Sequence, residues 1–483
     1  MLFNSYEFIF LFLPILFFGY FFLTSKRLII ASKVWLVLGS LFFYSWWNVA
    51  YLPIILSSML INFAVGNSFS STKKVSKKTL LSFGIVFNIA LLGYFKYADF
   101  FIGNFNDVFG SDVPLLHIAL PLAISFFTFQ QIAYLVDSYR GETKEYDFLN
   151  YALFVTFFPQ LIAGPIVHHK EMMPQFAKSS TFVKNYKNIA LGLFIFSIGL
   201  FKKVVIADTF ATWATAGFDT ATTLNLFEAW ATSLSYTFQI YFDFSGYTDM
   251  AIGAALLFNI RLPINFSSPY KATNIKDFWR RWHITLSRFL RDYVYIPLGG
   301  NRVGKQRNYL NLFSVFLIGG IWHGASWMFF VWGALHGVAI VIHRIWSEMG
   351  YKLNVFVAWF ITFNFINITW VFFRAKEWED ALKVLSSMFS LGNVVLHPMF
   401  QSKLGFLTQY GITFAGMFEN ISGSKMTIVW ILGTLVLVLL FKNSMEKMKS
   451  FTPNKKVAIF TAFLLSFGIL SLTKVSEFLY FNF

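Results

Sequence analysis

The residue that most suggests chemistry is a histidine inside an apolar, tryptophan-rich stretch, His323 in GGIWHGASWMFFVWGALHG. Burial there disfavours the imidazolium, so His323 is expected to be neutral and to act as a general base or a hydrogen-bond partner. No second histidine stands three or four residues away, so metal binding within this helix is not indicated. The next histidine, His336, is expected on the following helix. A packing role is the simpler alternative for His323.

A second group of reactive side chains is the basic stretch 271–307, with nine basic residues against two acidic ones. Its centre, KDFWRRWHITLSRFLRDYVYIPLGG, predicts one amphipathic helix from near Asp277 to Pro297. The expected apolar face comprises Trp279, Trp282, Leu286, Phe289, Leu290 and Tyr293, with Ser287 on the next face and His283 on the border. The helix either lies on anionic lipid or forms a phosphate-binding rim at a cytoplasmic mouth, and both can hold. The arginines available for phosphate are Arg280, Arg281, Arg288 and Arg291.

Carboxylates and a histidine pair interrupt two further apolar segments. YFDFSGYTDMAIG carries Asp243 and Asp249, and we expect a helix break there, at which Asp or Ser caps a new helix. FPQLIAGPIVHHK is expected to break at Gly164-Pro165, just before His168 and His169. Adjacent histidines point apart on a helix, so a metal site with both as ligands is not expected.

The composition says what surrounds these groups. The chain has 483 residues, of which 57% are hydrophobic, 21% aromatic and 13% charged. Charged residues make up about 25% of globular proteins, and single soluble cores stop growing near ~250–300 residues. The high aromatic content also excludes a disordered chain. An integral membrane protein is the class that remains.

Charge and cysteine content exclude further classes. The chain has no cysteine, so it has no disulfide, thiolate metal site or cysteine nucleophile. The net charge of +16 fits the excess of basic residues in cytoplasmic loops better than nucleic-acid binding, because the basic residues form no soluble domain or tail.

Apolar stretches of helix length recur along the chain and predict roughly eleven membrane spans. We expect them near 8–23, 28–47, 50–66, 80–97, 119–137, 150–166, 187–206, 228–258, 311–329, 331–346, 355–373, 427–442 and 457–473, some of them re-entrant. The first stretch has no basic residue before it and no small-residue cleavage site after it, so it is not expected to be a cleaved signal peptide. Loop charges place the N-terminus and Phe483 outside, and Lys26, Arg27 and the 73–78 loop inside.

Several motifs together resemble the membrane-bound O-acyltransferase family. They are WRRWHITLSRFLRDYVYIPLGGNR, GGIWHGASWMFFVWGALHG, FDFSGYTDMAIG, LIAGPI and GYFKYADF. The resemblance covers nearly the whole chain and implies an all-α polytopic membrane protein, a ring of transmembrane and re-entrant helices around a central funnel or tunnel. One integral-membrane domain over 1–483 is expected, with a motif core at about 119–346 and C-terminal helices at 427–483.

The resemblance also implies an acyltransferase and its site. Its catalytic histidine maps to His323, and a second polar motif residue maps to His283. The donor is a thioester, expected to be cytoplasmic acetyl-CoA acting as a substrate, with no permanently bound cofactor and no metal. The acetyl group would cross a bacterial inner membrane to an extracellular or cell-wall polysaccharide of the alginate type, with an extracytoplasmic SGNH-hydrolase-like partner completing the transfer.

The C-terminal sequence SEFLYFNF carries one phenolic hydroxyl, that of Tyr480. An aromatic belt at the membrane interface would explain it. Alternatively, Tyr480 is an acyl relay that accepts the acetyl group near His323 and presents it to the partner. In that case Tyr480→Phe abolishes transfer.

Other functions remain open. The same fold could acetylate peptidoglycan or transfer D-alanine to teichoic acid from a carrier protein. Intramembrane Asp and His would also suit a transporter of a glycan or lipid intermediate, although the two halves show no inverted repeat. A purely structural scaffold is disfavoured because buried ionisable groups without a task are costly.

Overall fold

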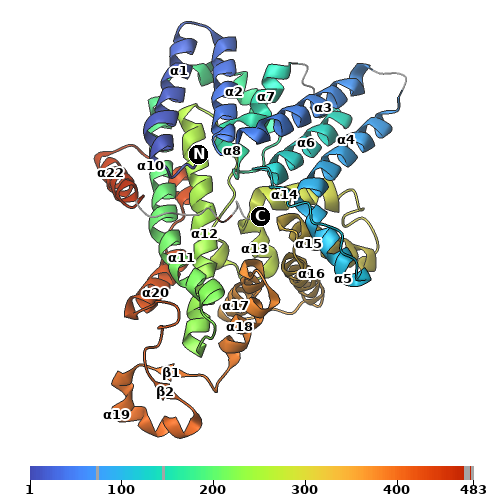
Figure 1. Ribbon diagram of the computed structural model, residues 1–483. Coiled ribbons are helices and arrows are strands. Elements are labelled where there is room, and N and C mark those ends of the chain that lie inside the picture. Colours follow the sequence, from blue (N-terminus) through green and yellow to red (C-terminus); the bar gives the residue numbers. More distant parts are fainter. Residues whose placement is uncertain (72–74, 144–146, 473–478, 480–483) are drawn as a thin grey trace.

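The computed structural model describes residues 1–71, 75–143, 147–472 and 479, and it consists almost entirely of helices (Figure 1). Within these ranges the strands are a short parallel pair, β1 (Val395–Leu396) and β2 (Thr413–Phe414). The all-α class expected from the sequence is therefore confirmed.

The α-helices form two series along the chain, separated by the mostly non-helical segment 258–274. The first series is α1 (Leu13–Ser25), α2 (Ile29–Ser45), α3 (Leu52–Ser71), α4 (Lys77–Leu92), α5 (Ala98–Phe109), α6 (Ile124–Tyr139), α7 (Phe148–Thr156), α8 (Phe158–Leu161), α9 (His169–Phe176), α10 (Tyr186–Phe201), α11 (Asp208–Thr215) and α12 (Leu226–Leu257). The second is α13 (Ile275–Arg281), α14 (Ile284–Leu290), α15 (Lys305–His323), α16 (Trp327–Glu348), α17 (Val355–Arg374), α18 (Trp378–Phe389), α19 (Gln401–Leu404), α20 (Lys425–Leu440), α21 (Ser444–Lys449) and α22 (Lys455–Leu470). Short π-helical or 3₁₀ segments are η1 (Glu7–Phe12), η2 (Val49–Tyr51), η3 (Gly93–Tyr97), η4 (Ser179–Phe182), η5 (Lys202–Ala207), η6 (Ala216–Thr220), η7 (Pro269–Lys271), η8 (Arg291–Tyr295), η9 (Pro398–Phe400) and η10 (Gly405–Tyr410).

Length and hydropathy mark the helices that can cross a bilayer. Six in the described part of the chain qualify: Glu7–Ser25, Val49–Ser70, Lys77–Phe109, Tyr186–Thr220, Trp327–Glu348 and Val355–Arg374. Ile29–Ser45 and Lys425–Leu440 are also apolar but shorter. The structure confirms a polytopic membrane protein and leaves the expected number of about eleven spans unconfirmed. Apolar stretches such as 150–166 divide into short helices, in this case α7 and α8.

Helix α12 runs through the centre of the molecule beside α10 and α11 (Figure 1). Its first turn has a complete capping box between Asn225 and Glu228. A Cβ added to Gly253 would lie 2.6 Å from the backbone oxygen of Gly192 on α10. Glycine at this crossing lets the two backbones approach closely, which strengthens packing where lipid supplies no hydrophobic drive.

The break expected at Asp243 and Asp249 is absent, because α12 is continuous across both residues. Instead, each carboxylate forms a buried ion pair with η5, the segment that extends α10. Lys203 Nζ lies 2.6 Å from Asp243 Oδ1, and Lys202 Nζ lies 2.7 Å from Asp249 Oδ2. The prediction failed because pairing with a neighbouring helix makes a carboxylate tolerable inside a continuous apolar helix, and one sequence does not reveal that partner.

Helices α15 and α16 form a hairpin whose tip carries His323. At the open end, Lys305 Nζ lies 3.3 Å from Glu348 Oε2. Helix α17 packs along α16, with His336 Nε2 3.2 Å from Thr369 Oγ1. This hairpin, α13, α14 and α17 together position the candidate site.

Candidate active site

The basic stretch is two helices rather than the single amphipathic helix expected. Helix α13 ends at Arg281 and α14 begins at Ile284, with His283 between them in the left-handed region at φ +42°. A neighbouring loop holds this corner: Asn265 Oδ1 lies 3.1 Å from His283 Nδ1 and accepts a hydrogen bond from Thr285 Oγ1 at 3.0 Å. Helical periodicity continues across the corner in sequence, so the break depends on Asn265, a residue 18 positions away.

The predicted apolar face of this stretch is mostly buried in spite of the break. Trp279, Trp282, Leu286, Phe289 and Leu290 each have less than a tenth of their surface exposed. The stretch therefore belongs to the protein interior along this face and does not simply lie on lipid.

His323 is 4% exposed and ends α15 inside a cluster of aromatic rings. Its ring centroid lies 4.9 Å from that of Trp322, 5.2 Å from Trp332 and 5.0 Å from Phe373. Apolar surroundings of this kind exclude water and suit a neutral imidazole that handles a proton.

The other two histidines of the motifs lie in the same cluster. His283, which is fully buried, has its ring 6.4 Å from Trp322, and His336 has its ring 4.7 Å from Trp332. Trp322 and Trp332 thus join His283, His323 and His336 into one aromatic site. The structure brings together His323 and His283, the two residues predicted to be catalytic.

A cavity of about 340 Å³ borders the tip of the α15–α16 hairpin, and we call it the tip cavity. Lys96, Asp99, Gly324, Ser326 and Phe329 are among the residues that line it. The cavity therefore borders the backbone that directly follows His323.

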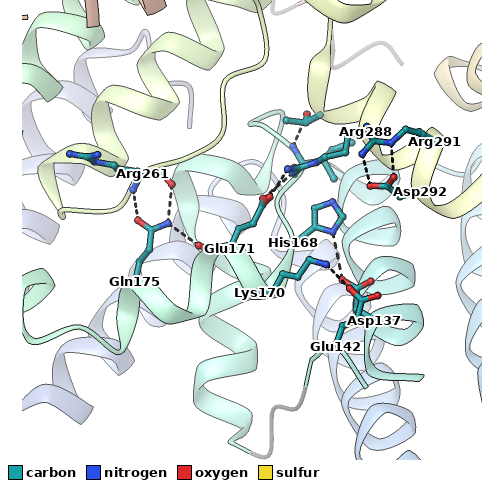
Figure 2. A network of polar contacts seen from close by, with 12 residues as sticks. Asp137, Glu142, His168, Lys170, Glu171, Gln175, Arg261, Arg288, Arg291 and Asp292 are labelled. Carbon is teal, nitrogen blue, oxygen red and sulfur yellow. Dashed lines mark hydrogen bonds and ion pairs between the residues drawn. The ribbon is translucent and has the colours of Figure 1, made fainter. Parts of the chain in front are cut away.

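A second cavity of about 250 Å³, which we call the arginine cavity, is lined by residues of α6, α9, α14 and η8 and of the loop after α6. Figure 2 shows the polar contacts of several of these residues. Its wall carries three cationic side chains and four carboxylates, together with polar and apolar neighbours: Arg140, Lys170, Arg288, Asp137, Glu142, Glu171, Asp292, His168, Tyr293 and Ile296. The hydrogen bond from Lys170 to Glu142 raises the pKa of Lys170, so this lysine stays cationic at neutral pH.

Stacked rings connect the arginine cavity to His323. The ring of Tyr293, at the cavity wall, lies 4.9 Å from that of Phe289, which stacks on Phe129 at 4.0 Å. Phe129 stacks on Trp322 at 4.8 Å, beside His323. A polar cavity lined by charges of both signs is therefore linked to the buried His323 through stacked aromatic rings.

The four predicted phosphate-binding arginines do not share one site. Arg288 lines the arginine cavity and donates two hydrogen bonds to Glu171, at 2.5 and 2.9 Å (Figure 2). Arg291 pairs with its neighbour Asp292. Arg281, on the other side of the break, pairs with Asp277, and Arg280 is exposed. The break at His283 separates the set that a single helix would have aligned.

The two histidines after Gly164-Pro165 contact different partners. His168 Nδ1 lies 2.9 Å from the hydroxyl of Tyr293, whereas His169 packs its ring against Phe154. Among the described residues, no cluster of three or more His, Asp or Glu is arranged to hold a metal ion.

Sequence reasoning missed the residues of the arginine cavity outside α14, namely Arg140, Lys170 and Glu171. They come from helix ends whose charges look like ordinary loop charges. It also missed Lys96, although a lysine inside the apolar stretch GYFKYADF is a signal for function.

The predicted relay residue, Tyr480, lies outside the described residues. Its neighbour Leu479 is described, and the Leu479 amide donates to Asp243 Oδ2 on α12 at 3.3 Å.

A buried histidine in an aromatic cluster of a helical membrane protein, linked by stacked rings to a cavity lined by arginine and lysine as well as carboxylates, is an arrangement that suits a membrane acyltransferase. The model of the membrane-bound O-acyltransferase family matches residues 40–375, and the chain belongs to this family.

Relatives in three groups match the chain. A peptidoglycan O-acetyltransferase of Helicobacter pylori is 51% identical, and the match covers 100% of this chain and 98% of that protein. A protein named probable alginate O-acetylase AlgI from Pseudomonas aeruginosa is 39% identical over 84% of this chain and 78% of its own length. A teichoic acid D-alanyltransferase of Bacillus subtilis is 27% identical over 53% of this chain and 69% of its own. The protein is therefore an acyltransferase, which disfavours the transporter and scaffold alternatives.

Proposed function

We propose that this protein transfers acetyl groups from cytoplasmic acetyl-CoA across a bacterial inner membrane to hydroxyls of cell-wall peptidoglycan. The observation that carries the choice of acceptor is the 51% identity, over the whole chain, to a peptidoglycan O-acetyltransferase. An alginate-type polysaccharide, the acceptor first expected, is the second candidate, supported by 39% identity over 84% of the chain. The shorter, 27% match to a D-alanyltransferase gives alanylation less support.

In this proposal the cationic side chains of the arginine cavity, Arg140, Lys170 and Arg288, bind the polyanionic end of the donor. Guanidinium groups bind phosphate oxygens in a bidentate fashion, and a phosphate would replace Glu171, the present bidentate partner of Arg288. The apolar acyl arm would follow the aromatic surface from Tyr293 towards Trp322, which keeps water from the thioester.

His323 would act as the general base. It takes the proton of the attacking hydroxyl, the oxygen bonds to the acetyl carbonyl carbon, and the carbon–sulfur bond breaks to release coenzyme A as its thiol once protonated. His283, held by Asn265, would orient or assist, and Tyr480 would be the first acceptor if the relay operates. An extracytoplasmic hydrolase-like partner would then pass the acetyl group to the glycan.

Mass spectrometry of muropeptides tests the acceptor. Cells that express the protein should carry O-acetylated muropeptides, and both His323→Gln and Tyr480→Phe should remove the modification. If deletion of the protein leaves muropeptide acetylation unchanged but removes acetyl groups from an exopolysaccharide, the acceptor is the second candidate, an alginate-type polysaccharide. Unchanged acetylation in Tyr480→Phe alone would remove the relay and leave the acceptor in place.

Replacing Arg288 by Gln should raise the KM for acetyl-CoA by about 10-fold or more, because a charge-assisted hydrogen bond contributes about 1.5–3 kcal/mol. The maximal rate should change much less, since Arg288 is remote from the reacting carbonyl. Steady-state kinetics with purified protein measure both parameters.

Arg281→Gln is the matched control for Arg288→Gln. Arg281 pairs with Asp277 and does not line the arginine cavity, so its loss should leave KM close to that of the wild type. Equal increases in KM for the two variants would contradict the assignment of the donor site to the arginine cavity.

A further inference from the structure

The last turn of α15 presents backbone carbonyl groups that its own helix cannot satisfy. The final carbonyls of any α-helix lack intrahelical donors. In α15 the chain leaves the helix in extended conformation at Gly324, with φ −168° and ψ 157°, so no following turn closes the helix end. This end carries His323, whose ring packs against aromatic rings, and Gly324, which lines the tip cavity.

Two consecutive residues of η3 bind these carbonyl groups. Lys96 Nζ donates to the Trp322 oxygen at 2.7 Å and to the His323 oxygen at 3.0 Å. The Tyr97 hydroxyl donates to the Ile321 oxygen at 2.6 Å. Successive residues can serve the same helix end because η3 is a π-helical segment inserted between α4 and α5, and such insertions are frequent at functional sites.

The contacts of Lys96 indicate a positioning role rather than a chemical one. An ammonium group has three N–H donors, and Lys96 Nζ has three partners, the third being Ser125 Oγ at 3.2 Å. A cation also complements the negative end of the α15 dipole. With its donors engaged by the protein, Lys96 is held in place and holds the end of α15 in turn.

A further hydrogen bond joins α5 to the other side of the hairpin tip. Trp327 Nε1, in the first turn of α16, donates to Asn104 Oδ1 on α5 at 2.8 Å. The continuous stretch from α4 to α5 therefore grips both sides of the hairpin tip. His323 is the last residue of the gripped turn, so its backbone position depends on these contacts.

We infer that Lys96 is a positioning residue that fixes the backbone of His323 for acyl transfer. This inference rests on the proposed function of His323 as general base. Catalysis depends on placement, and a misplacement of about 1 Å can cost about 100-fold in rate.

The test compares Lys96→Met with the matched control Lys383→Met. Lys383 also donates to two backbone carbonyls at a helix end, those of Phe218 and Ala221, but it lies on α18, away from His323. In Lys96→Met, kcat for acetyl transfer should fall by about 50-fold or more while the KM for acetyl-CoA stays within about two-fold. Lys383→Met should keep kcat within about three-fold per folded protein.

Two further variants test whether the loss of kcat follows the number of hydrogen bonds that are removed. Lys96→Arg keeps the charge and several donors and should recover part of kcat, and Tyr97→Phe, which loses one hydrogen bond, should cost less than Lys96→Met. If Lys96→Met does not fold, Lys96→Gln tests the same loss with one donor group retained. Wild-type kcat in Lys96→Met or Lys96→Gln, or an equal loss of kcat in Lys383→Met, would overturn the inference.

Hydrogen exchange separates this inference from the proposed function. Loss of the Lys96 side chain should speed amide hydrogen exchange in the 318–330 segment, and loss of the Lys383 side chain should not. This result does not depend on which acyl donor the protein uses. If wild-type protein fails to use acetyl-CoA, the proposed function is wrong. Amide exchange in the Lys96 variant then still tests whether Lys96 holds the end of α15. If wild-type protein transfers acetyl groups but amide exchange in segment 318–330 is unchanged in the Lys96 variant, the positioning role of Lys96 is wrong.

Discussion

Replacing His323 by Gln should lower acetyl transfer from acetyl-CoA by about 10²–10⁴-fold, the range expected when a general base is lost. Glutamine has a similar reach but cannot take a proton, so folding should survive the change better than chemistry does. Transfer of labelled acetyl by purified protein, normalised to the amount that elutes as folded protein, measures the effect.

His336→Gln is the control, because it replaces the same residue type in the same aromatic cluster. His336 is fully buried, accepts a hydrogen bond from Trp279 Nε1 at 3.2 Å and lies beside Thr369. Its loss should reduce stability while activity per folded molecule stays within about five-fold. Equal losses in the two variants, or full activity of His323→Gln, would refute the assignment of His323 as the base.

Replacing Asp249 by Ala should cost about 3–5 kcal/mol of unfolding free energy, because it leaves Lys202 buried without its carboxylate. Lys202 is 8% exposed and Asp249 3%, and Lys202 Nζ also reaches Ser444 Oγ at 3.1 Å. The midpoint of thermal unfolding in detergent reports the loss.

The double variant Lys202→Met with Asp249→Leu should recover most of that stability, since an apolar pair of similar volume avoids the cost of burying charge. Arg344→Ala serves as the surface control: its pair with Glu348 is partly exposed and should contribute less than about 1 kcal/mol. A double variant that is less stable than Asp249→Ala would show that the ion pair stabilises the fold beyond charge neutralisation.

Much of the fold and part of the site follow from the sequence. The apolar, aromatic composition predicts a membrane protein because a single soluble core could not bury so many apolar side chains. The Trp-rich stretch around His323 predicts a dry imidazole, and the structure places it in an aromatic cluster. The non-helical segment around Gly164-Pro165, between α8 and α9, was also predictable, because proline lacks the donor that continues a helix.

Other features required the structure because they depend on pairs of distant residues. The carboxylates of Asp243 and Asp249 look like a helix break until the lysines of η5 are placed beside them. The corner at His283 is held by Asn265 in another segment, and it divides the four arginines that the sequence predicts to form one phosphate-binding rim.

Hydrophobicity and local helical periodicity are properties of neighbouring residues, so the sequence already predicts a lipid environment, the helical class and the burial of His323. The tertiary structure alone decided which charges are paired, which cations gather at the arginine cavity, and that Lys96 holds the end of α15. Hydrogen bonds and ion pairs act over about 3 Å, so their partners are settled only when the helices have packed.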